Sequence, residues 1–336
     1  MDYRFVTVTW GDQFTDLLLD VMLPNQLTPG NLGYFRGHPG CVYRIFTREA
    51  DAARIAKSPV YAKLLSVMPA ELVVVPDLGA ESGHHAAYDD MSRCHRLAIA
   101  EAEAADAAMI FLPGDAIWSE GSFRRLSELC ESGYRAVLIA GIRLVRETYV
   151  DAFLDRFFDP ATLEARAGAR DLVAHALNHL HPLTNAYRLD SDQFISFPSH
   201  LIWPVEDRGF LLKAFHLHPA IVKPQVPGGA LSVTIDHDYL KQACPDPTQI
   251  YVVEDSDEIL QVAVDARDHR SDLLKPNRFN LTRFAEFAKG RTEDFQRKIF
   301  VEKAIYVHSD AIGSDWDKVR AQSAGLVERF NFAMSA

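Results

Sequence analysis

The stretch AAMIFLPGDAIWSEGSFRRL, residues 107–126, decides how the fold is interpreted. It opens with an apolar run, residues 109–112, that predicts a buried strand ended by Pro113 and Gly114. Asp115 follows at once, and an amphipathic stretch at residues 122–130 predicts a helix. In an open parallel sheet, a carboxylate at this point would face the crevice beyond the strand ends, where ligands bind.

A simpler interpretation of Asp115 is a turn residue. Pro-Gly-Asp is ordinary turn chemistry, because the Asp side chain bonds the nearby backbone. The elements around this stretch favour the functional interpretation over the turn.

Short β-rich runs alternate with helical patterns through the first half of the chain. Strands are expected at residues 5–10, 42–46, 72–75, 109–112 and 136–142. Helices are expected at residues 14–22, directly after Thr47, at 87–105 and at 122–130. Because these strands are apolar on both faces, they predict an α/β fold with a mostly parallel sheet flanked by helices.

The second half is less regular and predicts an elaborated α+β portion. Helical patterns cover residues 147–180, a polar loop follows at 181–198, and strands are expected within 202–222 and at 231–235. Helices return at 279–329, interrupted by a strand at 304–308. We divide the chain into residues 1–145 and 146–336, and expect one continuous domain because no linker separates them.

The composition limits the classes of protein. Hydrophobic residues make up 48% and charged residues 24%, which is typical of soluble globular proteins. The net charge of -11 argues against a nucleic-acid binder, although an anionic ligand could still bind in a local basic pocket. The four cysteines, Cys41, Cys94, Cys130 and Cys244, lack CxxC spacing, so reduced thiols are expected. No signal peptide and no apolar run of about 20 residues is visible, which predicts a cytoplasmic protein without a membrane span.

Several common chemistries lack their motifs. The chain has no GxxxxGK[ST] and no GxGxxG after the first strand, which disfavours P-loop and dinucleotide sites. It also has no GxSxG, the nucleophile turn of α/β-hydrolases.

Three histidines are candidate metal ligands. His216 and His218 are two residues apart, so on one strand they would project from the same face, as two ligands of one ion would. The alternative is that both form hydrogen bonds in a polar crevice without a metal. His308 ends the late strand and is followed by Asp310; a lone histidine is usually structural, unless this strand returns to the same edge of the sheet.

Carboxylates in two further stretches are candidate catalytic groups. Asp236 and Asp238 flank His237 in SVTIDHDYL, where either acid could instead cap a helix. Glu254 opens the acidic run of YVVEDSDEIL, where a helix N-terminus would also favour acids through its dipole.

Three segments together resemble the GT-A type glycosyltransferases. They are FVTVTWGDQFTDLLLDVMLPNQLTPGNL (5–32), YRIFTREADAARI (43–55) and AIAEAEAADAAMIFLPGDAIWSEGSFRRLSEL (98–129). The resemblance is one of pattern and covers about residues 4–145. It implies a GT-A-like, Rossmann-like fold that binds a nucleotide-sugar donor and transfers the sugar to a glycan, lipid-linked or small-molecule acceptor.

One departure from this family affects the metal. The family uses two acids, one residue apart, to hold a divalent cation on the diphosphate; here Pro113 replaces the first acid and only Asp115 remains. The resemblance therefore implies Mn²⁺ or Mg²⁺ held by Asp115 with a later histidine, His216, His218 or His308. A metal-free variant that uses basic residues for the diphosphate is the alternative.

The resemblance also implies donor-binding residues near the first strands and the long helix. Seven residues are expected to bind the donor: Thr9, Trp10, Gly11, Thr47, Tyr88, Ser92 and Arg93. Trp10 could stack on the nucleobase or belong to the core, and Arg93 could bind phosphate or be a solvated surface charge.

Sugar transfer further requires a base for the acceptor hydroxyl. We expect Asp236 or Asp238 in this role, with Glu254 or His218 as second candidates. Two other classes stay open: a metal-dependent hydrolase built on the histidines and Asp236/Asp238, and a non-catalytic binding protein with a GT-A-like fold. Oligomeric state is not readable from the sequence.

Overall fold

The computed structural model describes residues 1–336 except 82, 227, 229–230, 232–234 and 336. The chain forms two compact units, each built from several segments. Unit 1 comprises residues 1–139, 153–167 and 218–252, and unit 2 comprises residues 140–152, 168–217 and 253–336. The sequence analysis instead divided the chain once, after residue 145.

Unit 1 is built around a mixed, mostly parallel seven-stranded sheet with the order β13-β6-β12-β4-β1-β2-β3. The strands are β1 (Tyr3–Val8), β2 (Cys41–Thr47), β3 (Ala70–Val74), β4 (Ala108–Phe111), β6 (Ala136–Ile139), β12 (His218–Val222) and β13 (Ile250–Val252). Strand β12 runs antiparallel to both β4 and β6, and all other neighbours are parallel. The predicted α/β class with a mostly parallel sheet is confirmed.

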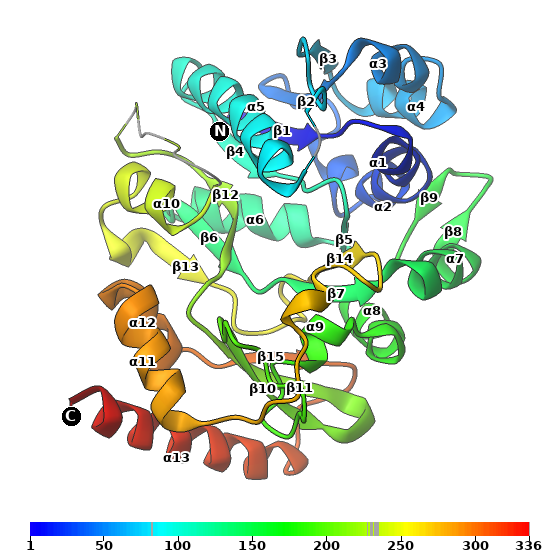
Figure 1. The fold of residues 1–336 in the computed structure, drawn as a ribbon. Coiled ribbons are helices and arrows are strands. Elements are labelled where there is room, and N and C mark those ends of the chain that lie inside the picture. Colours follow the sequence, from blue (N-terminus) through cyan, green and yellow to red (C-terminus); the bar gives the residue numbers. More distant parts are fainter. Residues whose placement is uncertain (82, 227, 229–230, 232–234, 336) are drawn as a thin grey trace. The chain divides into compact units, whose positions relative to one another are not determined.

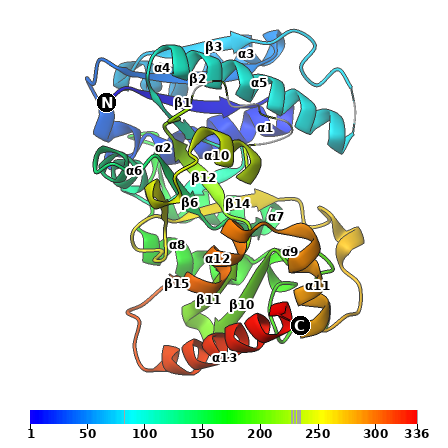
Figure 2. The ribbon, with the colours of Figure 1, turned by 90° about the vertical axis from the view of Figure 1, so that its left-hand side faces the viewer.

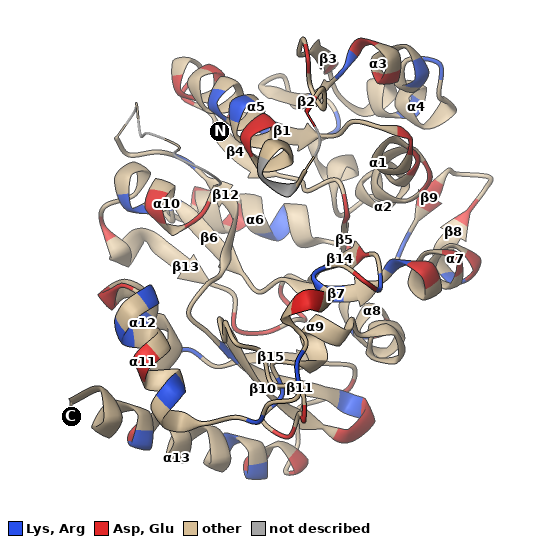
Figure 3. Ribbon diagram, viewed as in Figure 1, with Lys and Arg blue, Asp and Glu red and all other residues tan. Residues whose placement is uncertain are grey.

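Helices cover both faces of this sheet. Helix α5 (His84–Ala104) lies across β1 and β4, where its Cys94 and Ala98 pack against Val6 (Figure 1). Phe5, on the opposite face of β1, contacts Phe123 of α6 (Ser122–Glu131) with ring centroids 6.0 Å apart. Figure 2 shows α5 running along the sheet from the side. Strands β4 and β6 are apolar on both faces, and Figure 3 shows β6 and β12 free of charged residues.

The other elements of unit 1 are short. The helices are α1 (Asp12–Leu17), η1 (Leu18–Met22), α2 (Leu23–Gln26), η2 (Leu32–Phe35), α3 (Glu49–Ile55), α4 (Pro59–Val67), α10 (His237–Ala243) and η5 (Pro247–Gln249). The strands are β5 (Ala116–Trp118), β8 (Phe158–Asp159) and β9 (Glu164–Ala165). Helix α7 (Arg146–Phe157) has residues in both units.

Unit 2 contains an antiparallel sheet with the order β10-β11-β15. Its strands are β10 (His200–Val205), β11 (Gly209–Ala214) and β15 (Ile305–His308), and β7 (Ile142–Val145) pairs in parallel with β14 (Gln261–Asp265). Its helices are α8 (Ala169–Ala176), η3 (Leu177–His179), α9 (Pro182–Asn185), η4 (Glu206–Arg208), η6 (Ser271–Leu273), α11 (Leu281–Arg291), α12 (Asp294–Glu302) and α13 (Asp315–Ser335).

An aromatic core holds α11, α12 and α13 on this sheet. Phe215 stacks on Phe300 of α12 with centroids 4.4 Å apart, and Phe284 of α11 and Phe330 of α13 complete the cluster. Burying several aromatic side chains in one place supplies much of the stabilisation of a core this size.

Two predicted elements differ from the structure, and a third lies largely outside the described residues. The strand expected at 136–142 is two strands, β6 and β7, which belong to different sheets. The helix expected at 147–180 is interrupted by β8 and β9. The strand expected at 231–235 falls largely outside the described residues, because 232–234 are not described. No helix within the described part of the chain is both long and apolar enough to span a membrane.

Candidate functional site

The order of the strands in unit 1 creates a switch point between β1 and β4. From β1 the chain adds β2 and β3 on one side, then crosses to place β4 on the other side of β1. In open α/β sheets, ligands bind beyond the carboxyl ends of the strands at such a point. The loop after β4 lies against the end of β1, since a Cβ added to Gly114 would lie 3.3 Å from the carbonyl oxygen of Val8. We define the carboxyl edge as the ends of β1, β2 and β4 and the start of β12.

Gly11 and Asp51 fix the backbone at the end of β1. Gly11 has φ +81°, a left-handed conformation that favours glycine, and its N–H donates to Asp51 Oδ2 at 2.9 Å. Asp51 is 3% exposed and also accepts a hydrogen bond from Arg48 Nε at 2.5 Å. This bond raises the pKa of Arg48, which therefore keeps its charge beside the carboxyl edge.

Three buried hydroxyl groups lie on the elements that meet at this edge. Thr9 follows β1, Thr47 ends β2, and Ser92 belongs to α5; each is at most 1% exposed. None of the three hydroxyl oxygens has a hydrogen-bond partner among the residues that the structure describes. A buried polar group without a partner is costly, so these three hydroxyls are candidates to bond a ligand.

Trp10 packs against Gly79, directly beyond the end of β1. A Cβ at Gly79 would lie 2.5 Å from the Trp10 ring, and the backbone there has φ +72°. The N–H of Gly79 donates to Asp90 of α5 at 2.7 Å, and Asp90 pairs with Arg93 at 3.2 Å. Trp10 is only half-buried, which leaves part of its ring accessible at the carboxyl edge.

Arg93 and Tyr88, two of the expected donor-binding residues, lie on the first half of α5. Arg93 Nη2 donates to the carbonyl oxygen of Pro76 at 2.9 Å, so this side chain ties α5 to the segment after β3. Tyr88 is half-buried on the same helix. The role expected for both stays a prediction.

Asp115 and His218 lie at the same edge of the sheet on neighbouring strands. Asp115 is half-buried in a turn in which the N–H of Ala116 donates to the carbonyl oxygen of Pro113 at 3.2 Å. His218 is exposed and opens β12, paired with Ile139, the last residue of β6. Because β12 is antiparallel to β4, its first residue lies at the end where β4 finishes.

Among the candidate metal ligands, His216 and His308 do not lie close enough to bind one ion together. His216 and His218 are not on one strand, since His216 lies between β11 and β12 and bonds Gln296 through Nδ1 at 2.8 Å. His308 pairs with Gly209 at the start of β11, whereas His216 follows the end of that strand. A strand of this length spans about 17 Å, too far for two ligands of one metal.

His308 instead lies beside two acids of unit 2. Its Nε2 is 2.8 Å from Asp255 Oδ1, and its Nδ1 is 2.7 Å from the carbonyl oxygen of Asp310. The ligand atoms of His308, Asp255 and Asp257 all lie within 4.8 Å of one another, so these three side chains could hold a metal ion. Arg170 competes for Asp257, to which it donates from Nε and Nη2 at 2.9 and 2.7 Å.

The three candidate bases have different environments. Asp236 caps α10 by accepting from the N–H of Asp238 at 3.0 Å, so the capping alternative is correct for this acid. Asp238 is exposed in the first turn of the same helix. Glu254 pairs with Lys303 Nζ at 2.7 Å and accepts from the N–H of Ala304 at 3.2 Å, which is a structural role at the start of β15.

The sequence analysis missed His95. This residue of α5 lies one turn after Ser92, and its ring meets that of Phe111, the last residue of β4, with centroids 5.8 Å apart. Burial lowers the pKa of His95 to about 4, and its Nδ1 has no hydrogen-bond partner in the described part of the chain. His95 is thus a neutral imidazole at neutral pH, near the end of β4, the strand that precedes the Asp115 turn.

Comparisons with known proteins give only distant structural similarity. No protein-family model and no curated protein sequence matches the chain. Among solved structures, S. aureus TarS is 11% identical with a TM-score of 0.26, over 42% of this chain and 22% of TarS. A Bacillus anthracis protein assigned as a glucose-1-phosphate thymidylyltransferase, solved with sucrose, is 13% identical with a TM-score of 0.23, over 43% of this chain and 55% of that one. The chain thus spans about a fifth and about half of these proteins, and TM-scores of this size do not establish a common fold.

Proposed function

We propose that the protein is a glycosyltransferase that binds a nucleotide-sugar donor at the carboxyl edge of unit 1. The observation that carries the proposal is the switch point between β1 and β4, with the unpartnered hydroxyls of Thr9, Thr47 and Ser92 around it. Hydroxyl groups of this kind can bond the ribose and base of a nucleotide, and the half-buried Trp10 offers a ring for stacking. The resemblance of residues 4–145 to GT-A type enzymes supports the same conclusion.

In the proposed reaction, the acceptor hydroxyl attacks the anomeric carbon of the donor sugar. A C–O bond forms to the acceptor, the bond to the diphosphate breaks, and the nucleoside diphosphate leaves with the electron pair. The hydroxyl proton passes to a base, and the negative charge on the diphosphate requires a cation. Arg48 lies directly after β2; its Nε and Nη2 bond Asp51, which leaves Nη1 as a donor to the diphosphate.

A divalent cation is the second source of positive charge. Asp115 and His218 offer one carboxylate and one imidazole at neighbouring strand ends, a donor set that suits Mn²⁺ better than Mg²⁺. When bound there, the cation would neutralise diphosphate oxygens. We propose this pair in place of the larger histidine set.

Asp238 is the proposed base. It lies in the first turn of α10 with an exposed carboxylate, whereas the carboxylate of Asp236 caps that helix.

A ligand-binding experiment tests the donor site. Calorimetry with UDP, GDP and their sugar conjugates, with and without Mn²⁺, should show binding and a rise in Tm. Thr47→Val should leave the free protein as stable or more stable, because its hydroxyl has no protein partner, yet weaken the nucleotide about tenfold. Ser323→Ala, which removes a buried unpartnered hydroxyl of unit 2, is the matched control and should leave affinity unchanged.

A transfer assay tests the base. Asp238→Asn should abolish sugar transfer while nucleotide binding persists. Asp106→Asn, which changes another exposed acid of unit 1, should leave both transfer and binding unchanged. Nucleotide binding without transfer in the unaltered protein would favour the non-catalytic binding protein instead.

A further inference from the structure

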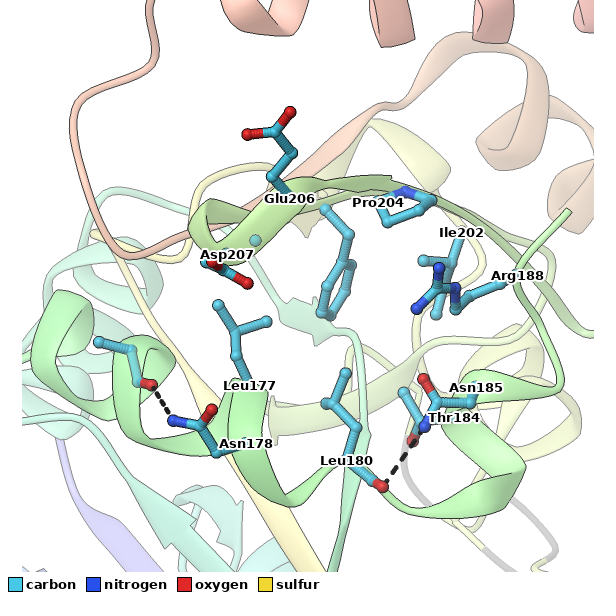
Figure 4. Close-up of a pocket in the computed structure, with 13 residues that line it drawn as sticks. Leu177, Asn178, Leu180, Thr184, Asn185, Arg188, Ile202, Pro204, Glu206 and Asp207 are labelled. Carbon is cyan, nitrogen blue, oxygen red and sulfur yellow. Dashed lines mark hydrogen bonds between the residues drawn. The ribbon is translucent and has the colours of Figure 1, made fainter. Parts of the chain in front are cut away.

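Unit 2 contains a cavity of about 480 Å³, and its lining residues have no role in the donor site proposed above. It is enclosed by the segment from α8 to α9 and by the β10-η4-β11 hairpin (Figure 4). Small-molecule sites in proteins occupy roughly 300–1,000 Å³. The cavity is therefore large enough for a small organic ligand.

The middle of the cavity is apolar. Leu177, Leu180, Ile202 and Phe210 line it, and Ile202 and Phe210 are 3% exposed. In Figure 4, Leu177 and Leu180 reach into the space from one side, with Pro204 and Ile202 across from them. A hydrocarbon group placed here would be removed from water, which stabilises the complex.

Polar groups of opposite charge stand on two sides of this apolar surface. Asp207 points its carboxylate into the cavity, and Arg188 faces it from the opposite side (Figure 4). No residue in the described ranges forms a hydrogen bond or ion pair with the Asp207 carboxylate. Arg188 uses Nε and Nη2 to bond Asp190 at 2.9 and 2.8 Å, which leaves Nη1 as a donor to a ligand.

The hairpin turn that presents Asp207 is strained. Glu206 has φ +40°, a left-handed conformation that a residue with a side chain adopts only at a cost. In Figure 4, the Glu206 carboxylate points away from the cavity while the next residue, Asp207, points inward. The turn thus separates two adjacent acids, one towards the cavity and one towards solvent.

We propose that this cavity binds a small primary amine with an apolar body and a hydrogen-bond acceptor at its far end. The ammonium group would bond Asp207, the apolar body would cover Leu177 and Leu180, and the acceptor would bond Arg188 Nη1. Straight-chain ω-amino acids, in which methylene groups separate the ammonium from the carboxylate, are the simplest members of this class. Phosphorylated ligands are disfavoured, because Arg188 is already paired with Asp190 and Asp207 would repel them. This inference is independent of the donor site in unit 1.

Calorimetry with four probes on the full chain tests the chemistry. 6-Aminohexanoate should bind, whereas 6-acetamidohexanoate, which lacks the ammonium group, and hexylamine, which lacks the carboxylate, should each bind about tenfold more weakly. Glucose, which has neither group, should not bind. This series uses the unaltered protein, so it decides the class of ligand even if a variant fails to fold.

Two adjacent substitutions then locate the site. Asp207→Asn should weaken 6-aminohexanoate binding about tenfold, while Glu206→Gln, one residue away and pointing outward, should leave it unchanged. Equal effects of the two variants would show a general surface-charge effect and overturn the proposal. So would equal binding of 6-aminohexanoate and its N-acetyl derivative, or no binding of 6-aminohexanoate at millimolar concentration.

Discussion

Asp51 and Gly11 are joined by a hydrogen bond of 2.9 Å between a buried carboxylate and a backbone N–H, across 40 residues of sequence. This bond ties the start of α3 to the end of β1 and holds the glycine in its left-handed conformation. The two residues belong to different strand–helix connections, so their contact fixes the spacing of two neighbouring loops at the carboxyl edge.

Asp51→Ala should therefore destabilise the protein and disturb the donor site together. Loss of a hydrogen-bonded buried carboxylate costs about 2–3 kcal/mol, because Gly11 N–H and Arg48 both lose their partner. Urea unfolding measures this cost. Asp51→Asn keeps an oxygen for the Gly11 N–H and should cost less; equal losses in the two variants would show that the Arg48 charge pair, and not the link to Gly11, is the important contact.

Gly79→Ala should displace Trp10. The added Cβ would overlap the indole ring, which lies 2.5 Å from its position, and the backbone there has φ +72°. The Trp10 ring should move, changing the tryptophan fluorescence and weakening any nucleotide that stacks on it. Gly37→Ala is the matched control, because Gly37 has φ +77° and nothing within 4 Å of the added atom. The Gly37→Ala variant adds backbone strain alone. An identical change of tryptophan fluorescence in the two variants would therefore show that the contact between Gly79 and Trp10 is not its cause.

His95 should make the protein sensitive to acid. Its pKa is lowered to about 4 in the folded state, against 6.5 when unfolded, so the unfolded state binds the extra proton first as the pH falls. Stability should decline between pH 6.5 and pH 4 by roughly 2–3 kcal/mol from this group. His95→Gln should flatten that part of the profile in urea unfolding at several pH values. A profile as steep as that of the unaltered protein would mean that other groups cause the loss.

Lys213→Met should destabilise unit 2. The Lys213 Nζ donates to the carbonyl oxygens of Phe300, Val301 and Lys303 at 3.1, 3.1 and 2.9 Å, which caps the C-terminal end of α12. Methionine fills the space but leaves these carbonyl groups unbonded, at a cost of about 2–3 kcal/mol. Lys298→Met, on the exposed face of the same helix, should be nearly neutral in thermal unfolding. Equal Tm values for the two variants would contradict the capping role.

The parallel sheet could be predicted because its strands carry a local signal. The run at residues 109–112 is apolar on both faces and is ended by Pro113 and Gly114, and the run at 42–46 is apolar except for Arg44 and is followed by Thr47. Short segments therefore indicate both the burial and the ends of these strands. The split of residues 136–142 into β6 and β7 carries no such signal, since both halves are apolar and only tertiary pairing separates them.

The histidines show the same limit of sequence-based prediction, because their roles depend on tertiary structure. The spacing of His216 and His218 indicates a shared face only if both lie on one strand, and β11 ends before His216, where Phe215 turns into the aromatic core. His95 was missed for the opposite reason: one histidine in a long helix resembles any other polar residue. Only its one-turn distance from Ser92 could have drawn attention to it, and that spacing acquires meaning once β4 is known to lie beneath.

The position of β12 between β4 and β6 has a consequence for biosynthesis. Two central strands emerge from the ribosome early but stay without their shared neighbour until residue 222 has been made. During that interval their backbone groups form open edges, which attract other chains. A fragment that stops at residue 145 should therefore aggregate, and chaperone dependence during synthesis should ease only after the antiparallel strand arrives.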